Sequence, residues 1–206
     1  MPKVSEDYKE KKRQIIMESA LILFGEKGYE LTTIDDIGAK SGISKGMVYT
    51  YFKSKEDLYI TLMDQRTNHT FNILKERFEE LDTAEQKIIE LLRIYREAEN
   101  MEEWSNSIRV HMEFWLNSSR QEHLKNIMKD RYKKQFRAFL MQIIQEGQDN
   151  GEFKKDIQME IVASLFWAII DGICLHYTVV GKEYNYKEHF LISQEMILQY
   201  ILISKK

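Results

Sequence analysis

Apolar residues recur at helical spacing in nearly every long segment of this chain. Within residues 8–27 the repeat places four of them on one helical face: Ile16, Ala20, Leu23 and Phe24. The same period predicts helices over residues 83–99, 103–117, 122–148, 157–180 and 186–202. The only proline is Pro2, so no proline interrupts helical hydrogen bonding further along the chain. The pattern predicts an all-α fold.

Residues 32–55, TTIDDIGAKSGISKGMVYTYFKSK, predict two short helices joined by a tight turn. Thr33 and Asp36 have the spacing of a capping box, so the first short helix is expected to begin there. Gly42 supplies the backbone freedom that the turn requires. The inward face of the first helix is expected to hold Ile34, Ile37 and Ser41.

Ser44 is expected to cap the second short helix, with Val48 and Phe52 packed inward. Its outward residues are then Lys45, Gly46, Tyr49 and Thr50. The whole chain has a formal net charge of −3, but residues 38–55 contain four lysines and no acidic residue. A positive surface at a helix N-terminus suits DNA phosphates, and Ser44, Thr50, Tyr49 and Tyr51 add hydroxyl donors. The segment therefore predicts a helix-turn-helix that reads duplex DNA. The alternative is a helical hairpin inside a larger α-protein, with the same rings in its core.

A dense run of residues resembles the N-terminal DNA-binding domain of the TetR family of bacterial one-component regulators. The matching positions are Thr33, Ile37, Gly42, Ile43, Ser44, Gly46, Val48, Tyr49, Tyr51, Phe52, Lys55, Glu56 and Leu58. The departures are Gly38 and Ser41, where alanines are usual, and Thr50, where a larger ring is frequent. The resemblance implies phosphate contacts by Thr33, Tyr49, Tyr51 and Lys55, and base-edge contacts by Lys45, Gly46 and Tyr49.

The resemblance also implies two domains. A three-helix DNA-binding domain is expected over residues 1–54, and a helical domain for ligand binding and dimerisation over residues 55–206. Ser54 and Asp57 have the spacing of a second capping box, which starts the helix linking the two domains. Lys55 would lie in the first turn of that helix, where a phosphate can meet both its ammonium and the positive helix end.

Several classes of protein are disfavoured by what the sequence lacks. A lone Cys174 excludes an internal disulfide, and no zinc-binding, nucleophile or phosphate-loop pattern is present, so neither an enzyme nor a cofactor is expected. Glu18 interrupts the apolar part of the N-terminal segment, which argues against a signal peptide and for a cytoplasmic protein. Residues 161–180 are long and apolar enough to cross a bilayer, but Asp171 within them favours a soluble core.

The last two predicted helices carry more apolar surface than one subunit is expected to expose. Self-association through a two-fold axis accounts for this surface, and it matches the four-helix dimer contact of TetR-like proteins. A dimer also presents two reading heads to successive major grooves, so the operator is expected to be near-palindromic. The expected interface residues are Phe166, Ile170, Ile173, Tyr177, Phe190, Ile197 and Ile201.

The middle helices are rich in rings, which can form either an ordinary core or a ligand pocket. The expected pocket residues are Trp104, His111, Phe114, Trp115, Tyr132, Phe136, Trp167 and Asp171. Such a lining suits a small hydrophobic effector, with Asp171 able to meet a cationic centre. The sequence thus predicts a dimeric transcriptional repressor that a small molecule releases from DNA. The alternative is a DNA-binding protein of the same fold with no inducer, acting architecturally or through a protein partner.

Overall fold

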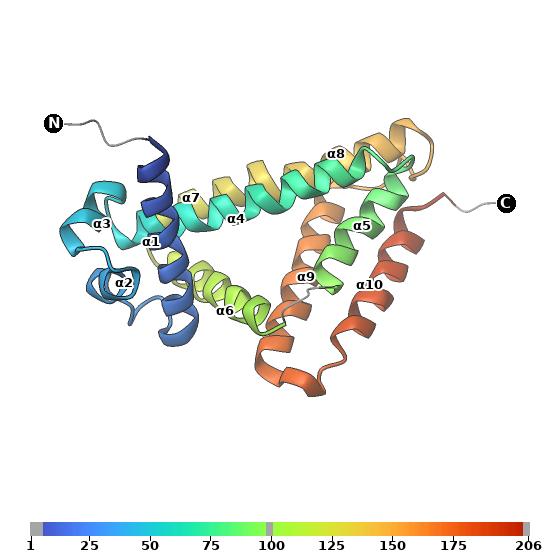
Figure 1. Cartoon of the computed structure of the whole chain (residues 1–206). Coiled ribbons are helices and arrows are strands. Elements are labelled where there is room, and N and C mark those ends of the chain that lie inside the picture. The colour runs from blue at the N-terminus through green and yellow to red at the C-terminus, as the bar shows by residue number, and fades with distance from the viewer. Residues whose placement is uncertain (1–5, 98–100, 204–206) are drawn as a thin grey trace.

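The protein was analysed as a computed structural model that describes residues 6–97 and 101–203. Among these residues, helices form the entire regular structure apart from one isolated bridge between Phe153 and Leu202, so the all-α prediction is confirmed. Figure 1 shows their arrangement. The elements are α1 (Glu6–Lys27), α2 (Ile34–Ser41), α3 (Lys45–Tyr51), α4 (Lys55–Phe78), α5 (Ala84–Arg96), α6 (Met101–Ser118), α7 (Glu122–Arg131), the π-helical segment η1 (Tyr132–Arg137), α8 (Ala138–Asp149), α9 (Met159–Val180), the 3₁₀ turn η2 (Gly181–Glu183) and α10 (Tyr186–Ile201).

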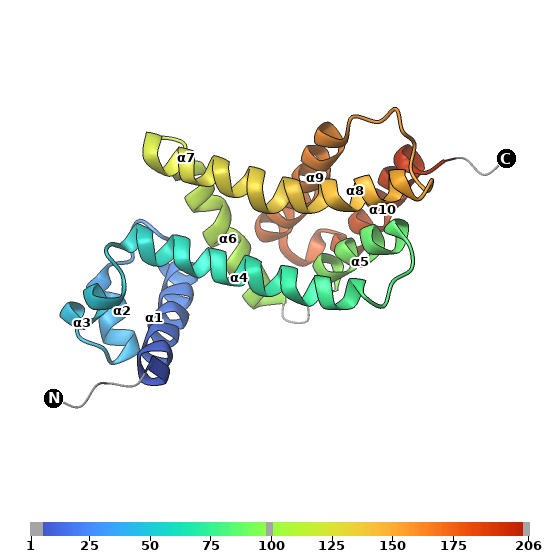
Figure 2. The same ribbon diagram turned by 90° about the horizontal axis from the view of Figure 1, so that it is seen from above.

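Helices α1, α2 and α3 form a head at one end of the molecule, and α5, α8, α9 and α10 form a bundle at the other (Figures 1 and 2). The long helix α4 runs from the head to the bundle, while α6 crosses beneath it. The molecule has two hydrophobic cores, one centred in the head and one in the bundle. The core of the head does not stop at residue 54, because it also takes in Tyr59 and Met63 of α4 and Val110 and Phe114 of α6.

The predicted helix over residues 122–148 is interrupted in its middle. Between α7 and α8 the chain passes through the π-helical segment η1, whose wider turn changes the register of the backbone hydrogen bonds. The indole Nε1 of Trp167 donates a hydrogen bond of 2.9 Å to the carbonyl oxygen of Phe136 within this segment. The periodicity of the sequence did not reveal this interruption, because one extra residue in a turn barely disturbs a broad apolar stripe.

Helix α9 is, by length and composition, the one described helix that could cross a membrane. One such helix is weak support for insertion, because the core helix of a soluble protein passes the same test. In this structure one side of α9 belongs to the core of the bundle, through residues such as Ala163, Phe166 and Ile170. The prediction of a core helix therefore has a direct structural basis.

The residues predicted for the dimer interface lie elsewhere. Phe166, Ile170, Ile173, Phe190, Ile197 and Ile201 are all buried within the single chain, and Tyr177 is half-buried against the same core. Helices α9 and α10 use these side chains to pack on each other and on α5, α6 and α8. Since both helices are apolar on opposite faces, their sequences do not show which face turns outward. The six buried side chains serve the core of the single chain and are not available for a dimer contact, while a contact by Tyr177 stays a prediction.

Candidate nucleic-acid interface and ligand cavity

Helix α2 begins with the predicted capping box. The Thr33 hydroxyl oxygen accepts from the Asp36 backbone N–H at 3.1 Å, and the Thr33 backbone N–H donates to the Asp36 carboxylate at 3.0 Å. Hydrogen bonds from Thr33, its backbone N–H first, lower the pKa of Asp36 to about 2. The Thr33 hydroxyl also donates to Asp36, at 2.8 Å. Thr33 thus serves the helix cap and lies against a carboxylate, an arrangement that does not favour its predicted phosphate contact.

The turn between α2 and α3 depends on two glycines. Gly42 has a φ of +67°, in the left-handed region that suits glycine. A Cβ atom on Gly38 would lie 2.8 Å from the carbonyl oxygen of Ile43, closer than a side chain can approach backbone. Gly38, one of the departures from the family pattern, therefore lets the turn pack closely on α2.

Helix α3 presents the predicted outward face. Ser44 accepts from the Met47 backbone N–H at 3.4 Å, which confirms its role as the cap. Val48 and Phe52 are buried, which confirms the inward side. The exposed residues of α3 and its cap are Ser44, Lys45, Gly46, Met47, Tyr49 and Thr50. Tyr51 is half-buried against the core of the head. The structure thus brings most of the predicted DNA-contacting residues together on one short helix.

Lys45 is held by an acidic neighbour on α2. Its ammonium lies 2.7 Å from the Asp35 carboxylate, and both side chains are more than half exposed. The hydrogen bond from Lys45 to Asp35 raises the pKa of this lysine, so it stays protonated. An exposed ion pair of this kind contributes little to stability. Lys45 can therefore leave Asp35 for a DNA partner without disturbing the fold.

Lys55 begins α4, as predicted, but its ammonium binds backbone atoms of the protein itself. Its ammonium donates to three backbone carbonyl oxygens in the segment between α1 and α2, those of Tyr29 at 2.8 Å, Glu30 at 3.1 Å and Thr32 at 2.9 Å. It also lies 4.4 Å from the centre of the Tyr29 ring. An ammonium has three N–H donors, and all three are used here. The geometry makes Lys55 a tie between α4 and the head and leaves it no donor for a phosphate.

Helix α6 holds the same segment from the other side. The Glu113 carboxylate accepts from the backbone N–H groups of Tyr29 and Glu30, at 3.0 and 3.5 Å. Phe114 stacks on Tyr59 of α4, with ring centroids 3.7 Å apart, and the Tyr59 hydroxyl donates to the carbonyl oxygen of Val110 at 3.3 Å. The head is therefore fastened to both α4 and α6. This link could not be predicted from the sequence, because Glu113 lies more than eighty residues from its partners.

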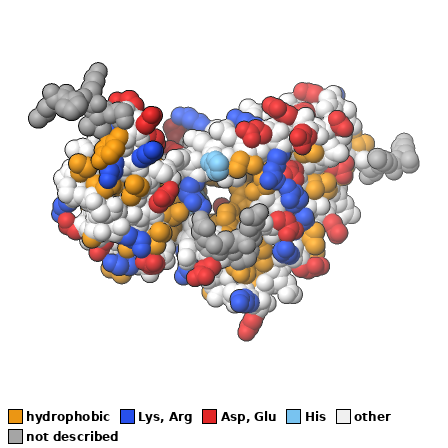
Figure 3. Space-filling model, viewed as in Figure 1, with side chains coloured by type: hydrophobic (Ala, Val, Ile, Leu, Met, Phe, Trp, Pro, Cys, Tyr) orange, Lys and Arg blue, Asp and Glu red, His pale blue; other side chains and the backbone are white. Residues whose placement is uncertain are grey.

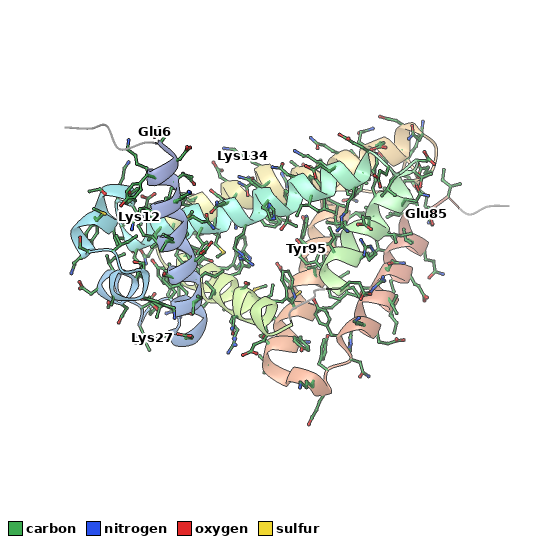
Figure 4. The ribbon with its side chains drawn as sticks, viewed as in Figure 1. Glu6, Lys12, Lys27, Glu85, Tyr95 and Lys134 are labelled. Carbon is green, nitrogen blue, oxygen red and sulfur yellow. The ribbon has the colours of Figure 1, made fainter. Side chains whose placement is uncertain are left out.

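A cavity of about 130 Å³ lies between the head and the bundle. Figure 3 shows a hollow in this face of the molecule, and Figure 4 shows Tyr95 on the side of α5 that faces it. The lining comes from α4, α5, α6, α7, η1 and α9. Its residues are Met63, Arg66, Thr67, Thr70, Phe71, Tyr95, Trp104, Ser107, Ile108, His111, Arg131, Phe136, Trp167, Ile170 and Asp171.

Five of the eight predicted pocket residues line this cavity: Trp104, His111, Phe136, Trp167 and Asp171. The other three do not. Phe114 is buried in the core of the head, Trp115 packs at the edge of that core, and the Tyr132 hydroxyl donates to Ser164 at 2.8 Å. Phe114 and Trp115 lie one turn beyond His111 on α6, where the helix has passed the cavity and packs against the core of the head. The prediction was wrong for these three residues.

The cavity contains two arginines that sequence reasoning missed. Arg131 is only 6% exposed, and its Nε donates to Asp64 of α4 at 2.6 Å. Its Nη2 donates to the Met63 carbonyl oxygen at 2.8 Å and to the Thr67 hydroxyl. Arg66 donates to the Ser107 hydroxyl at 3.1 Å. Arg131 is buried and Arg66 is half-buried, and both stand among charged residues in the sequence, which carries no signal of these positions.

Two acid–base groups of the cavity are shifted by their surroundings. Burial raises the pKa of the Asp171 carboxyl to about 6. Burial, and then the nearby charge of Arg131, lowers the pKa of His111 to about 4, so this imidazole is neutral near pH 7. Asp171 lines the cavity and is an exposed residue, so its pKa shift reflects the protein atoms around it and not complete burial. Shifted pKa values of this kind are found both at functional sites and in structural charge networks.

A short exposed helix set by a glycine turn, joined through a long helix to a helical domain with a cavity, is the arrangement of a helix-turn-helix regulator. The sequence model of the bacterial regulatory proteins of the tetR family matches residues 16–62, and that of the tetracyclin repressor-like C-terminal domain matches residues 91–186. The chain belongs to the TetR family, and it is a DNA-binding transcriptional regulator.

Individual relatives agree with this assignment. The HTH-type transcriptional regulator YfiR of Bacillus subtilis is 29% identical over 177 residues, which cover 84% of this chain and 82% of YfiR. A putative transcriptional regulator from Saccharomonospora viridis, solved in complex with choline, has a TM-score of 0.80 at 19% identity, covering 95% of this chain and 100% of that one. FadR of Bacillus subtilis, solved in complex with stearoyl-CoA, has a TM-score of 0.71 at 21% identity, covering 90% and 97%. These two structures are similar to this chain in fold.

Proposed function

We propose that this regulator is a homodimeric repressor that leaves a near-palindromic operator when a small molecule occupies the cavity between the head and the bundle. The observation that carries the proposal is the cavity itself, because α4 and α6 line it and both helices also hold the head. The alternative, a DNA-binding protein with no inducer, is less favoured because a filled core would not leave charged groups facing an open space.

The dimer is proposed to form through the outward faces of α9 and α10. On α9 the exposed apolar residues Ile161, Leu165, Leu175 and Val179 follow one another at helical spacing. On α10 a second exposed row consists of Ile192, Met196 and Tyr200, followed by Ile203. A contiguous apolar surface of this kind marks a protein contact, and a two-fold contact presents the same surface from both subunits.

The proposed DNA contacts follow the exposed face of α3. Lys45, Gly46 and Tyr49 are proposed to reach base edges in the major groove, while Ser44, Thr50 and Tyr51 contact phosphates. The backbone N–H groups of Lys45 and Gly46, at the N-terminus of α3, are proposed to add to these phosphate contacts. Thr33 and Lys55 are excluded from this proposal because their polar groups are used within the head.

The proposed release mechanism is a shift between two positions of the head. A ligand in the cavity contacts α4 and α6, and a small change in their relative position moves the head through Lys55 and Glu113. The two heads of the dimer then no longer match the spacing of successive major grooves. The ligand needs no contact with DNA, only a higher affinity for the released conformation.

The effector class is proposed to be a small molecule with an apolar part, because rings form much of the lining. The neighbours of the same fold were solved with ligands as different as choline and stearoyl-CoA, so the fold alone does not choose among effectors. A cytoplasmic location and the absence of enzymatic activity, expected from the sequence, fit a transcriptional regulator and belong to the same proposal.

The test begins with DNA selected by the purified protein from a random pool. We expect the selected sequences to contain an inverted repeat, and the complex to contain two protein chains. Fractions of a cell extract small enough to be metabolites are then added to this complex. Release of the DNA by such a fraction supports the repressor proposal, while binding that no fraction weakens favours the alternative without an inducer.

A further inference from the structure

Asp171 gives the cavity wall a negative charge that no described residue neutralises. Burial by the surrounding atoms raises the pKa of its carboxyl to about 6, and no hydrogen bond or charged partner among the described residues contributes to this shift. Most of the carboxyl is therefore ionised near pH 7. Asp171 is an exposed residue of the cavity wall, so a ligand in the cavity can reach its carboxylate.

The basic residues of the same wall are already engaged within the protein. Arg131 is 6% exposed and forms an ion pair with Asp64, with 2.6 Å between its Nε and the carboxylate. Arg66 donates to the Ser107 hydroxyl at 3.1 Å and is not a free cation. His111 is neutral near pH 7, because burial, and then the charge of Arg131, lowers its pKa to about 4. The charge that remains for a ligand to match is therefore negative.

Tyr95 of α5 brings a second oxygen to this part of the cavity. Its backbone carbonyl oxygen accepts from the Tyr186 hydroxyl at 2.8 Å, but its own hydroxyl has no hydrogen-bond partner among the described residues. This hydroxyl is not closed off from the cavity. Burial raises the pKa of Tyr95, and the nearby Cys174 and Asp171 raise it further, so the Asp171 carboxylate and the Tyr95 hydroxyl lie near each other. Two oxygens thus border the cavity without a donor.

The two indoles of the wall have no N–H group left for a ligand. Nε1 of Trp104 donates to the Tyr186 hydroxyl at 3.0 Å, and Nε1 of Trp167 donates to the Phe136 carbonyl oxygen at 2.9 Å. The Tyr95 ring meets both indoles edge to face, with centroids 5.6 and 6.0 Å apart, so these three rings pack on one another. A ligand that satisfies the two free oxygens must therefore bring its own donors.

We propose, on the premise that this cavity is the effector site, that the effector is a short primary amine, bound as its ammonium ion. The ammonium donates to the Asp171 carboxylate and to the Tyr95 hydroxyl, while the apolar part of the amine lies against the rings of Phe71, Phe136 and Trp167. An ammonium has three N–H donors, and its hydrogen bonds to a carboxylate are of the stronger, charge-assisted kind. The cavity measures about 130 Å³, and roughly 150 Å³ holds a benzene molecule, so the apolar part is a short chain or a single ring.

The test measures binding of butylamine, hexylamine and benzylamine to the full-length protein by calorimetry at pH 7.5. Two matched analogues accompany each amine: the primary alcohol, which has no charge, and the N-trimethyl derivative, which keeps the charge but has no N–H donor. For the amine that binds best, we expect each analogue to bind about tenfold to hundredfold more weakly, because each lacks the charge or the hydrogen bonds. Binding of either analogue with an affinity equal to that of the amine overturns the proposal.

Two variants assign the acceptors. Asp171→Asn should remove the preference for the amine over the alcohol. Tyr95→Phe should weaken binding of the amine by about tenfold and leave binding of the N-trimethyl derivative unchanged, because that compound donates no hydrogen bond. Glu160→Gln, which changes the other acid of α9 outside the cavity, should alter neither result. An unchanged preference for the amine in Asp171→Asn overturns the proposal.

The premise is tested separately in the same protein. If a metabolite fraction releases the operator but no amine of the series binds, the amine proposal is wrong and the repressor proposal stands. If no fraction releases the DNA and no compound binds in the cavity, the repressor proposal itself fails.

Discussion

The DNA-binding head and the cavity are built from the chain in opposite ways. The exposed face of α3 belongs to a helix of seven residues whose orientation is set by its own caps and turn. The cavity takes its lining from six elements that span residues 63–171. A local surface is fixed by local rules, so it can be read from sequence spacing. A surface assembled from distant helices depends on how those helices pack, and its charged groups lie on positions that look ordinary in the sequence.

The largest expected effect distinguishes substitutions on the exposed faces of α9 and α10 from substitutions on their buried faces. Leu165→Asp places a charge in the exposed apolar row of α9, so we expect a monomer that binds the selected operator at least about a hundredfold more weakly. Ile170→Ala, in the buried row, should lower the free energy of unfolding by about 2–4 kcal/mol and leave the dimer intact. Sedimentation, operator titration and chemical denaturation measure these effects. A dimer in Leu165→Asp and a monomer in Ile170→Ala would restore the interface expected from the sequence.

The next effect distinguishes two lysines of the head. Lys45→Ala should weaken operator binding by about tenfold and relax its sequence preference, because Lys45 lies on the exposed face of α3. Lys55→Ala should lower the free energy of unfolding by about 1–3 kcal/mol, since three carbonyl oxygens lose their donor. It should not change the slope of affinity against salt concentration. If the salt dependence of affinity in Lys55→Ala corresponds to about one phosphate contact fewer than in the wild type, this lysine does contact DNA.

A smaller effect tests the link between the cavity and the head. Glu113→Ala removes the acceptor for two backbone N–H groups, so we expect a loss of about 1–2 kcal/mol in unfolding free energy. Because one of the two ties to the head is lost, the effector fraction should release less DNA from this variant than from the wild type. Leu116→Ala, an exposed change on the same helix, is the control. If the effector fraction releases as much operator DNA from Glu113→Ala as from the wild type, the cavity is coupled to the head through α4 alone.

The smallest effect concerns the two titrating groups of the cavity. The native state keeps a proton on Asp171 up to about pH 6, whereas the unfolded carboxyl releases it near pH 3.8, so this group makes stability fall as pH rises between those values. His111 has a pKa of about 4 in the native state and 6.5 when unfolded, so it makes stability rise with pH between 4 and 6.5. The contributions of Asp171 and His111 to stability change with pH in opposite directions. The free energy of unfolding of the wild type should therefore change little over this pH range.

Replacing one of the two groups should therefore leave a measurable dependence of the free energy of unfolding on pH, because the opposing contribution of the other group is no longer cancelled. Asp171→Asn should gain about 1 kcal/mol above pH 6, a value reduced because the carboxyl opens into the cavity, and its stability should rise with pH. His111→Gln should instead become less stable as pH rises. Denaturation between pH 4 and pH 7 measures both. Parallel profiles for the two variants would contradict the assigned shifts.

Particular residues show how far sequence reasoning extended. The caps at Thr33, Ser44 and Ser54, the left-handed turn at Gly42 and the inward packing of Val48 are present as predicted, since each depends on residues a few positions apart. Helix ranges followed from apolar periodicity, except at η1. The partners of Lys55 and Glu113 were not predicted, because hydrogen bonds to backbone atoms of a distant loop leave no pattern in the sequence.

The sequence by itself determined an all-helical chain with a positively charged reading helix, because helix propensity, caps and turn chemistry act within a few residues. Only the tertiary structure decided which apolar face of α9 and α10 turns outward, and which polar side chains meet in the cavity. Both decisions arise from packing between helices, where an apolar or charged side chain takes its role from neighbours far away in the chain. Arg131 is the clearest case: its hydrogen bonds to Asp64 and Thr67 hold an ordinary basic residue buried and ion-paired in the wall of the cavity.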